Sequence, residues 1–338
     1  MDIYNDYVSR IKAAMTSGET RKHELNLEGI ANYNDEINKA FSYNTFRKIT
    51  PEEKLLPSMQ EFASSLNVNA NLNQKLGEHP DFVHLKQTKG IEKHYIVSVF
   101  IDIKRSTYLF KKYPPETVLI ITNTIQRAAI HTCLVFGGYI QRLHGDGLFV
   151  YFGRKGMRQD DAVKSALSAA STFTYFVKND LKNLFNEQGI EAIFTRTGID
   201  FGYDEDVVWA LAGIGDISEI TTYSLHTSLA SKMQAYAESN GIVAGDHIKN
   251  HSDQRYFSPV CSRTLKEEDR YIFRIPDRNF NYTQYDFQWM NFLKSLEFIA
   301  TDLNGILRVK NLSSLSKPSI TSNLQPVAVQ NRPYNRGS

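Results

Sequence analysis

A nearly continuous apolar run that ends in a carboxylate constrains the fold of this chain more than any other feature. The run extends from Tyr95 to Asp102 and reads YIVSVFID. Apolar side chains at successive positions are typical of a strand that is covered on both faces. We therefore expect a buried strand here, with the Asp102 carboxylate at its end.

A second carboxylate lies at the tip of a predicted hairpin. Two short β-runs, 139–143 and 148–152, are joined by His144-Gly145-Asp146-Gly147, and glycine supplies the positive φ that tight turns require. If the hairpin and the first strand are neighbours in one sheet, Asp102 and Asp146 lie at the same edge. Taken singly, either aspartate is explained more simply as a turn or cap residue.

The other periodicities predict an α+β fold in which helices alternate with strands. Helices are expected over 115–136, 159–186 and 225–238, and further strands over 193–201, 207–211, 241–244 and 270–275. This order suits a ferredoxin-like, split βαβ arrangement, with helices over one face of a mainly antiparallel sheet.

Composition restricts the classes of protein to which the chain can belong. Its 338 residues include 39 basic and 37 acidic side chains, a net charge of +2 that gives no reason to expect a nucleic-acid partner. The two cysteines, Cys133 and Cys261, cannot build a disulfide framework. No run of about 18 apolar residues occurs, and the N-terminus lacks the apolar core of a signal peptide. We therefore expect a soluble, cytoplasmic protein without a membrane partner.

Two carboxylates at one sheet edge repel each other unless a cation lies between them. Proteins bind Mg²⁺ through one or two carboxylates together with substrate phosphates, and a pair of such ions stabilises the attacking and leaving oxygens of phosphoryl transfer. The stretch after Asp102 holds the cations Lys104 and Arg105 and the hydroxyls of Ser106 and Thr107. A strand that turns into a helix here would present backbone N–H groups to an anion. The pattern predicts a triphosphate seat beside divalent cations.

Four segments, in this order, resemble the successive motifs of the class III nucleotidyl cyclases, the family of adenylate and guanylate cyclases. They are VFIDIKRST, QRLHGDGLFVYFG, RTGIDFG and TTYSLHTSLASKM. The resemblance implies a homodimer with active sites at the subunit interface, which converts a nucleoside triphosphate to a 3′,5′-cyclic monophosphate and pyrophosphate. It also implies that Asp102, Asp146 and the backbone carbonyl of Ile103 bind two ions of Mn²⁺ or Mg²⁺ per active site.

The positions that face the base depart from the purine cyclases. Arg142 stands where those enzymes have a lysine or glutamate, and Thr221 where they usually have an aspartate. Arg142 can only donate hydrogen bonds, whereas Thr221 can donate or accept them. Uracil presents two carbonyl acceptors and one N–H, so UTP is favoured over CTP, although cytosine is not excluded.

The positions that face the ribose and the transition state depart as well. Ser228 and Lys232 stand where the resemblance implies a ribose-orienting asparagine and a transition-state arginine. This alignment assumes no gap, and His226 or Thr227 could take the place of Ser228.

The chain is most similar to the pyrimidine cyclases of Pycsar antiphage systems, whose cUMP or cCMP activates a separate effector protein. The favoured prediction is a cUMP-forming enzyme. The alternatives are a cCMP-forming cyclase, a purine cyclase, and an inactive pseudo-cyclase that only binds a nucleotide.

The chain is predicted to consist of four parts. The parts are a helical flank over 1–90, the cyclase domain over 91–250, an extension over 251–310 and a tail over 311–338. The flank has an apolar stripe from Ile3 to Ile11 and a helix expected to start at Pro51. Within the extension, 284–303 is predicted to form an amphipathic helix, and the tail is predicted to be disordered.

Overall fold

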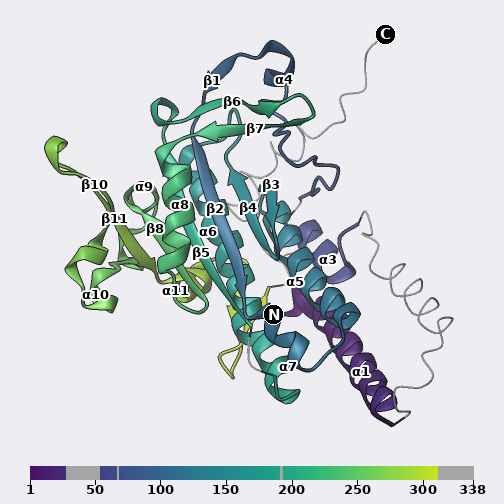
Figure 1. Ribbon diagram of the computed structural model, residues 1–338. Helices are drawn as coiled ribbons and strands as arrows, with labels where there is room; N and C mark the ends of the chain where they lie inside the picture. Colours follow the sequence, from purple (N-terminus) through teal and green to yellow (C-terminus); the bar gives the residue numbers. More distant parts are fainter. Residues whose placement is uncertain (28–53, 67, 191–192, 311–338) are drawn as a thin grey trace.

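The computed structural model describes residues 1–27, 54–66, 68–190 and 193–310 (Figure 1). Its centre is an eight-stranded sheet in the order β10-β11-β8-β5-β2-β4-β3, with β9 also paired to β11. Only β5 and β8 run parallel, so the predicted mainly antiparallel α+β fold is confirmed. The strands are β2 (Ile96–Lys104), β3 (Tyr139–His144), β4 (Gly147–Phe152), β5 (Phe194–Gly202), β8 (Gly241–Gly245), β9 (Phe257–Pro259), β10 (Tyr271–Ile275) and β11 (Phe280–Phe287).

Strand β2 lies in the middle of this sheet, between β4 and β5. Val97, Val99 and Ile101 face the main core, whereas Ile96 and Phe100 belong to a second apolar cluster around Trp209. Alternate side chains of a strand point to opposite faces, so a strand covered on both sides needs apolar residues at nearly every position. The apolar run therefore predicted this strand correctly.

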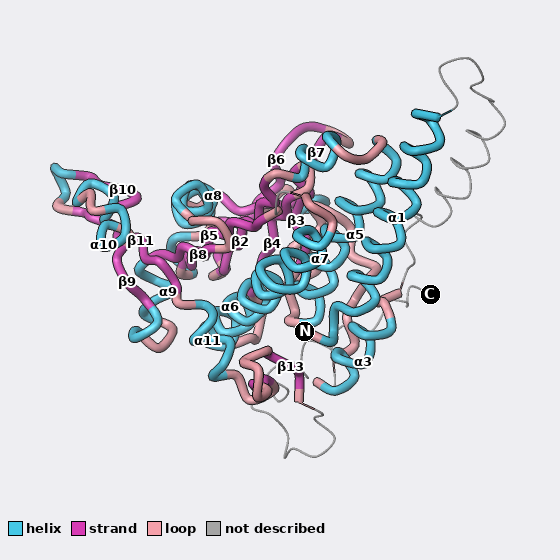
Figure 2. Tube along the Cα trace, turned by 90° about the horizontal axis from the view of Figure 1, so that it is seen from below, coloured by secondary structure: helices cyan, strands magenta, loops and turns pink. Residues whose placement is uncertain are grey.

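Helices cover both faces of the sheet, so the expectation of helices over one face is wrong. On one side lie α5 (Pro115–Val135) and α6 (Gln159–Tyr175), and on the other lies α8 (Leu225–Tyr236), as Figure 2 shows. Helix α8 packs directly on β5 at Gly198, where a Cβ atom would lie 2.1 Å from the carbonyl oxygen of Ala230. A glycine in this strand is what lets the helix backbone come so close.

A small second sheet forms an arm above the central one (Figure 1). It contains β1 (Ile91–Lys93), β6 (Val208–Ile214) and β7 (Ile217–Tyr223) in the order β1-β6-β7. The side chains of Ile214 and Ile217 at its tip are 80% and 83% exposed. Strand β7 is not predicted from its sequence, ISEITTY, because its apolar residues do not alternate.

The N-terminal flank is helical only in places, and its described residues 68–84 form turns and irregular structure. It contains η1 (Asp2–Tyr4), α1 (Asn5–Leu27), α3 (Pro57–Ser65) and α4 (Leu85–Thr88). Ile3, Tyr7 and Ile11 of the apolar stripe are buried in the main core, and α1 packs along α5. The helix start expected at Pro51 lies outside the described residues.

The prediction of an amphipathic helix over 284–303 is wrong for most of that range. Residues up to Phe287 belong to β11, and only α11 (Trp289–Ser295) is helical before β12 (Ile299–Thr301) and β13 (Leu307–Val309). The first part pairs with both β8 and β9, and this long-range pairing overrides the helical spacing of the apolar residues. The predicted helix over 159–186 is found as α6, a π-helical segment (Phe176–Leu181) and α7 (Lys182–Glu187).

Among the described residues, α5 is long and apolar enough to cross a membrane by length and composition. In this structure 61% of its most apolar window is buried inside the protein. The core helix of a soluble protein passes the same test, so α5 is explained by its place in the core.

One buried histidine makes the stability of the fold depend on pH. His79 is 1% exposed, with its ring 4.8 Å from that of Tyr139 and 4.9 Å from that of Trp209. Burial lowers the pKa of His79 to about 3. Since the unfolded chain takes up this proton near pH 6.5, the stabilisation is complete above that pH and is lost as the pH falls toward the folded value.

We expect the free energy of unfolding to fall between pH 7 and pH 5, with about 2 kcal/mol of the loss due to His79. Urea denaturation of the wild type and of His79→Leu at both pH values measures this share, because the variant lacks the titrating group. His144→Leu, at an exposed position, serves as the control and should retain the wild-type pH dependence. Identical pH dependence in the wild type and His79→Leu would contradict the assignment.

Candidate functional site

The two aspartates singled out in the sequence lie at the same end of the central sheet. Ile101 of β2 is directly opposite Leu148 of β4, so Asp102 follows close to the turn that holds Asp146. A Cβ atom on Gly147 would lie 2.6 Å from the Ile101 carbonyl oxygen and 3.4 Å from the Asp102 Cα. Glycine at this position therefore lets the turn sit against the end of β2, and the structure brings the two aspartates together.

Several donors surround one oxygen of the Asp102 carboxylate. Its Oδ2 lies 2.5 Å from Lys104 Nζ and 3.6 Å from the Arg196 guanidinium, and it accepts a 3.1 Å hydrogen bond from the Gln234 amide. The Asp102 side chain keeps 26% of its surface exposed. An accessible carboxylate that attracts positive groups is the kind of donor a divalent cation takes.

The donor set at this end of the sheet fits hard divalent cations. Asp102 and Asp146 supply carboxylate oxygens, and Ile103, whose side chain is buried, follows Asp102 directly in β2 and offers a backbone carbonyl oxygen. Oxygen ligands are those that Mg²⁺ and Mn²⁺ prefer. The structure thus gathers the three residues predicted to bind metal, and their metal-binding role stays a prediction.

The predicted triphosphate seat after β2 differs from an α-helix N-terminus. The chain enters a 3₁₀-helix, η3 (Ser106–Lys111), through Arg105 in a left-handed conformation with φ of 69°. The Arg105 guanidinium lies over the rings of Phe194 and Tyr108, 5.3 and 5.7 Å from their centroids. Here Lys104 pairs with Asp102 and Arg105 stacks on aromatic rings, while the exposed Thr107 and half-buried Ser106 follow.

A further residue joins the two positions predicted to face the base. Arg142 of β3 donates a 3.0 Å hydrogen bond from Nε to Glu219 of β7, and its terminal nitrogen pairs with the other carboxylate oxygen. Thr221 lies two residues after Glu219 on β7, 3.4 Å from the Tyr151 hydroxyl. Alternate residues of a strand share a face, so Glu219 and Thr221 point to the same side. The sequence argument missed Glu219 because β7 was not predicted.

Helix α8 separates the three candidates for the ribose-orienting position. Thr227 is hydrogen-bonded to Ser98 and to Thr222, at 2.9 Å each, and His226 is buried against Asp200. Ser228 is exposed, and its hydroxyl donates only to the Ser224 carbonyl of its own helix.

Lys232 is exposed one turn after Ser228, so the two share a face of α8. The geometry favours Ser228 over its two neighbours, and the roles of Ser228 and Lys232 stay predictions.

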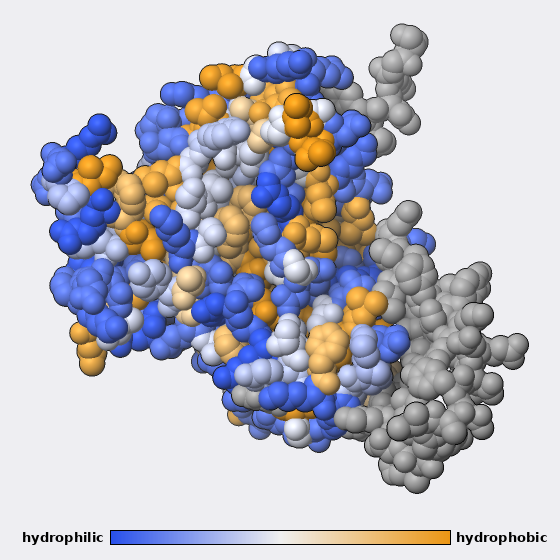
Figure 3. Space-filling view, viewed as in Figure 1, coloured by the Kyte–Doolittle hydropathy of each residue, from blue (hydrophilic) through white to orange (hydrophobic). Residues whose placement is uncertain are grey.

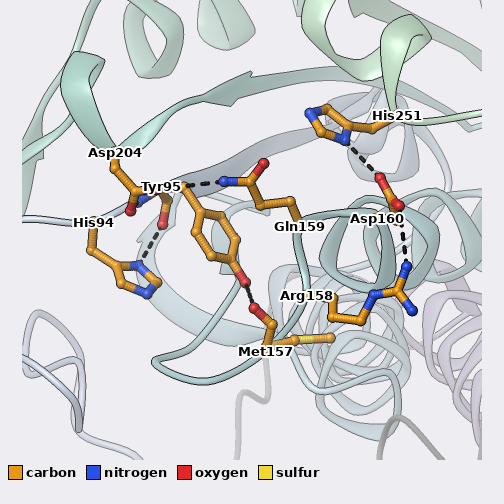
Figure 4. Close-up of a pocket in the computed structure, with 8 residues that line it drawn as sticks. All are labelled: His94, Tyr95, Met157, Arg158, Gln159, Asp160, Asp204 and His251. Atoms are coloured by element: carbon orange, nitrogen blue, oxygen red, sulfur yellow. Dashed lines mark hydrogen bonds and ion pairs between the residues drawn. The ribbon is translucent and has the colours of Figure 1, made fainter.

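A pocket of about 470 Å³ lies at the opposite end of β2 (Figure 4). Its lining includes Tyr95, just before β2 begins, and His251, which is paired with Asp160 at 2.7 Å. None of the predicted site residues lines it. The pocket is therefore separate from the end of the sheet that carries Asp102 and Asp146.

No protein-family model matches the chain. It is 36% identical over 262 residues to a cytidylate cyclase of Staphylococcus aureus, an alignment that covers 75% of this chain and 60% of that relative. A cytidylate cyclase of Escherichia coli is 33% identical over 208 residues, which is 60% of this chain and 46% of the relative. The chain thus spans only part of the length of these relatives. Among solved structures, the adenylyl cyclase CyaB of P. aeruginosa aligns with a TM-score of 0.48 at 18% identity, over 59% of this chain and 95% of that one.

Proposed function

We propose that this chain, a class III nucleotidyl cyclase related to the pyrimidine cyclases, converts a pyrimidine nucleoside triphosphate to its 3′,5′-cyclic monophosphate and pyrophosphate. The observation that carries the proposal is the placement of Asp102 and Asp146 beside each other, where β2 ends against the β3–β4 turn. Relatives named for cytidylate cyclisation support the pyrimidine base.

The reaction is an internal displacement at phosphorus. The ribose 3′-oxygen attacks the α-phosphorus, its proton is lost to solvent, the bond to the β-phosphate oxygen breaks, and pyrophosphate leaves. When bound, Mg²⁺ or Mn²⁺ supplies the positive charge that lowers the pKa of the 3′-hydroxyl and stabilises the phosphates. Asp102, Asp146 and the Ile103 carbonyl would hold these ions.

Lys104 has a second task in this scheme. Its ammonium now occupies Asp102 Oδ2, the oxygen that a cation would take. Lysine has a flexible stem, so a cation on Asp102 would displace the ammonium toward the triphosphate. The chain would then bind phosphate with Lys104, and the hydroxyls and N–H groups of Ser106 and Thr107 would add hydrogen bonds; Arg105 would add positive charge beside them.

The other half of each site would come from a second copy of the chain. Ser228 and Lys232 lie on the exposed face of α8, where they are available to a nucleotide held by another subunit. Lys232 would stabilise charge on the α-phosphate, and Ser228 would orient the ribose. The arm tip supports a homodimer, since Ile214 and Ile217 are 80% and 83% exposed and Figure 3 shows apolar side chains gathered there.

For the base we now favour cytosine, in place of the uracil that the sequence alone favoured. The carboxylate of Glu219 lies against the Arg142 guanidinium, so the site offers an acceptor beside a donor. The exocyclic amine of cytosine needs an acceptor, and its ring nitrogen and carbonyl need a donor. The named relatives are cytidylate cyclases, which supports CTP as substrate and cCMP as product, with UTP and cUMP as the second candidate.

The product would serve as a second messenger. The resemblance to the Pycsar cyclases supports a role in antiphage defence through a separate effector protein that the cyclic nucleotide activates. A purine cyclase and an inactive nucleotide-binding protein are the remaining alternatives, and an assay with each of the four ribonucleoside triphosphates separates them.

We expect Asp102→Asn and Asp146→Asn each to lower cyclic nucleotide formation at least 100-fold while the protein stays folded, as judged by circular dichroism, because each removes a cation ligand and keeps the size of the side chain. Mass spectrometry of the products with Mn²⁺ measures the loss. Asp277→Asn, at an exposed position in η8 (Pro276–Arg278), is the matched control and should keep full activity. Wild-type protein that forms no cyclic product from any triphosphate would refute the enzymatic proposal.

Mixing two inactive chains tests the shared site. Asp102→Asn damages the cation side and Lys232→Ala the α8 side, so a heterodimer of the two has one intact site. An equal mixture should recover about a quarter of wild-type activity, since half of the dimers are mixed and each has one of its two sites intact. A mixture of Asp102→Asn and Asp146→Asn should recover none. Recovery in both mixtures, or in neither, would contradict the shared site.

Glu219→Gln tests the choice of base. Loss of the charged acceptor should lower kcat/KM for CTP about 10- to 100-fold, more than for UTP, because the exocyclic amine loses its charged partner. Competition between CTP and UTP in one reaction gives the ratio directly. An unchanged ratio would remove Glu219 from base recognition, and a wild type that prefers UTP would restore the uridylate assignment.

A further inference from the structure

Three potential metal ligands meet away from Asp102 and Asp146. They are Asp206, in η5 (Asp204–Asp206), His226, in the first turn of α8, and His247, in α9 (Asp246–Asn250). One ligand atom of each lies within 4.8 Å of the others. Asp206 is exposed, His226 is buried and His247 is half-buried, so the cluster opens to solvent on the aspartate side.

The cluster lies away from the end of the sheet that carries Asp102. On β5, Arg196 is opposite Asp102, whereas Asp200, which holds His226, is four residues further along. Four residues of strand span about 13 Å. A cation bound at the three ligands is therefore distinct from the ions of the catalytic site.

Both histidine rings are oriented as metal ligands are. His247 Nδ1 is 2.9 Å from the Phe201 carbonyl oxygen, which can only accept, so Nδ1 carries the proton. His226 Nδ1 lies 2.9 Å from Asp200 Oδ2 and donates to it. Each ring is thus left with Nε2 as its lone-pair nitrogen, and His226 Nε2 lies 3.8 Å from the Asp206 carboxylate. A carboxylate or carbonyl that holds the other ring nitrogen is the usual support of a metal-binding histidine.

The supporting carboxylate is itself fixed. Asp200 is fully buried, and its other oxygen accepts a 2.7 Å hydrogen bond from the Tyr282 hydroxyl. A Cβ atom on Gly245 would lie 2.3 Å from this carboxylate, so the glycine makes room for it.

We propose that Asp206, His226 and His247 bind one Zn²⁺ ion. Two imidazole nitrogens and one carboxylate oxygen suit Zn²⁺, whereas Mg²⁺ prefers oxygen ligands alone. Tetrahedral ligands of zinc are about 3.3 Å apart, and the exposed Asp206 on its short turn provides the movement that closes the site. Three protein ligands leave the fourth position to water. The ion would fix the start of α8, whose exposed face carries Ser228 and Lys232.

Zinc content tests this proposal without any reference to catalysis. The test uses the full chain with Asp102→Asn and Asp146→Asn, because these substitutions remove the proposed catalytic ligands. A chelator strips this protein of metal, and it is then loaded with Zn²⁺ in excess Mg²⁺ and desalted. Mass spectrometry of the metal gives its zinc content. We expect about one zinc ion per chain, and with Co²⁺ the visible absorption of a tetrahedral site. Asp206→Asn and His247→Gln should each raise the zinc dissociation constant at least tenfold.

The matched control is His251→Gln, because His251 lies close to α9 but is paired with Asp160 and Tyr203 instead. It should bind zinc like the parent chain. Asp206 is exposed, so Asp206→Asn is informative even if His247→Gln fails to fold, as judged by circular dichroism. Less than about 0.2 zinc per chain in the parent, or an unchanged dissociation constant in Asp206→Asn, overturns the proposal and leaves His226 as an ion-pair partner of Asp200 and Asp206.

Discussion

The antiparallel pairing of β2 with β4 is the constraint on which the rest of the molecule depends. It places a carboxylate at the end of one strand against a turn that carries another, with Gly147 allowing the close approach. The negative charge of Asp102 is compensated by its neighbours, since Lys104, Arg196 and Gln234 all direct donors to it. Asp102 is thus held by three donors, and the proposed cation would take the place of the Lys104 ammonium.

Burial of β2 on both faces explains why Asp102, at the end of β2, and helix α8 lie so close together. Helices α5 and α6 cover one face, and each buries many apolar side chains. The other face is shared between the cluster around Trp209 and helix α8, which rests on Gly198 of β5. Gln234 of this helix reaches Asp102, while Ser228 and Lys232 on its outer surface remain accessible. One helix therefore holds Asp102 with one side chain and exposes two polar groups on its outer surface.

The features predicted correctly from the sequence are those fixed by neighbouring residues. The apolar run before Asp102 and the glycine turn around Asp146 each determine their own local structure, so the strand and the hairpin could be foreseen. The meeting of the two aspartates was predicted only on the condition that the hairpin lies beside the strand, and the pairing of β2 with β4 meets that condition. Other contacts between distant segments were missed. Strand β7 has no apolar alternation and is held by pairing with β6, so Glu219 and its bond to Arg142 were missed. The segment before Phe287 has helical spacing, yet its pairing with β8 makes it a strand.

The position of β11 has a consequence for how the protein can be shortened. This strand, which comes from the extension after residue 250, hydrogen-bonds along β8 and so covers what would otherwise be an open edge of the central sheet. A fragment trimmed to the motif-bearing region would expose the backbone of β8, and unpaired edges invite intermolecular strand addition. The extension thus protects this edge of the sheet. We expect the smallest fragment that folds without aggregating to be larger than the region that resembles the cyclase motifs.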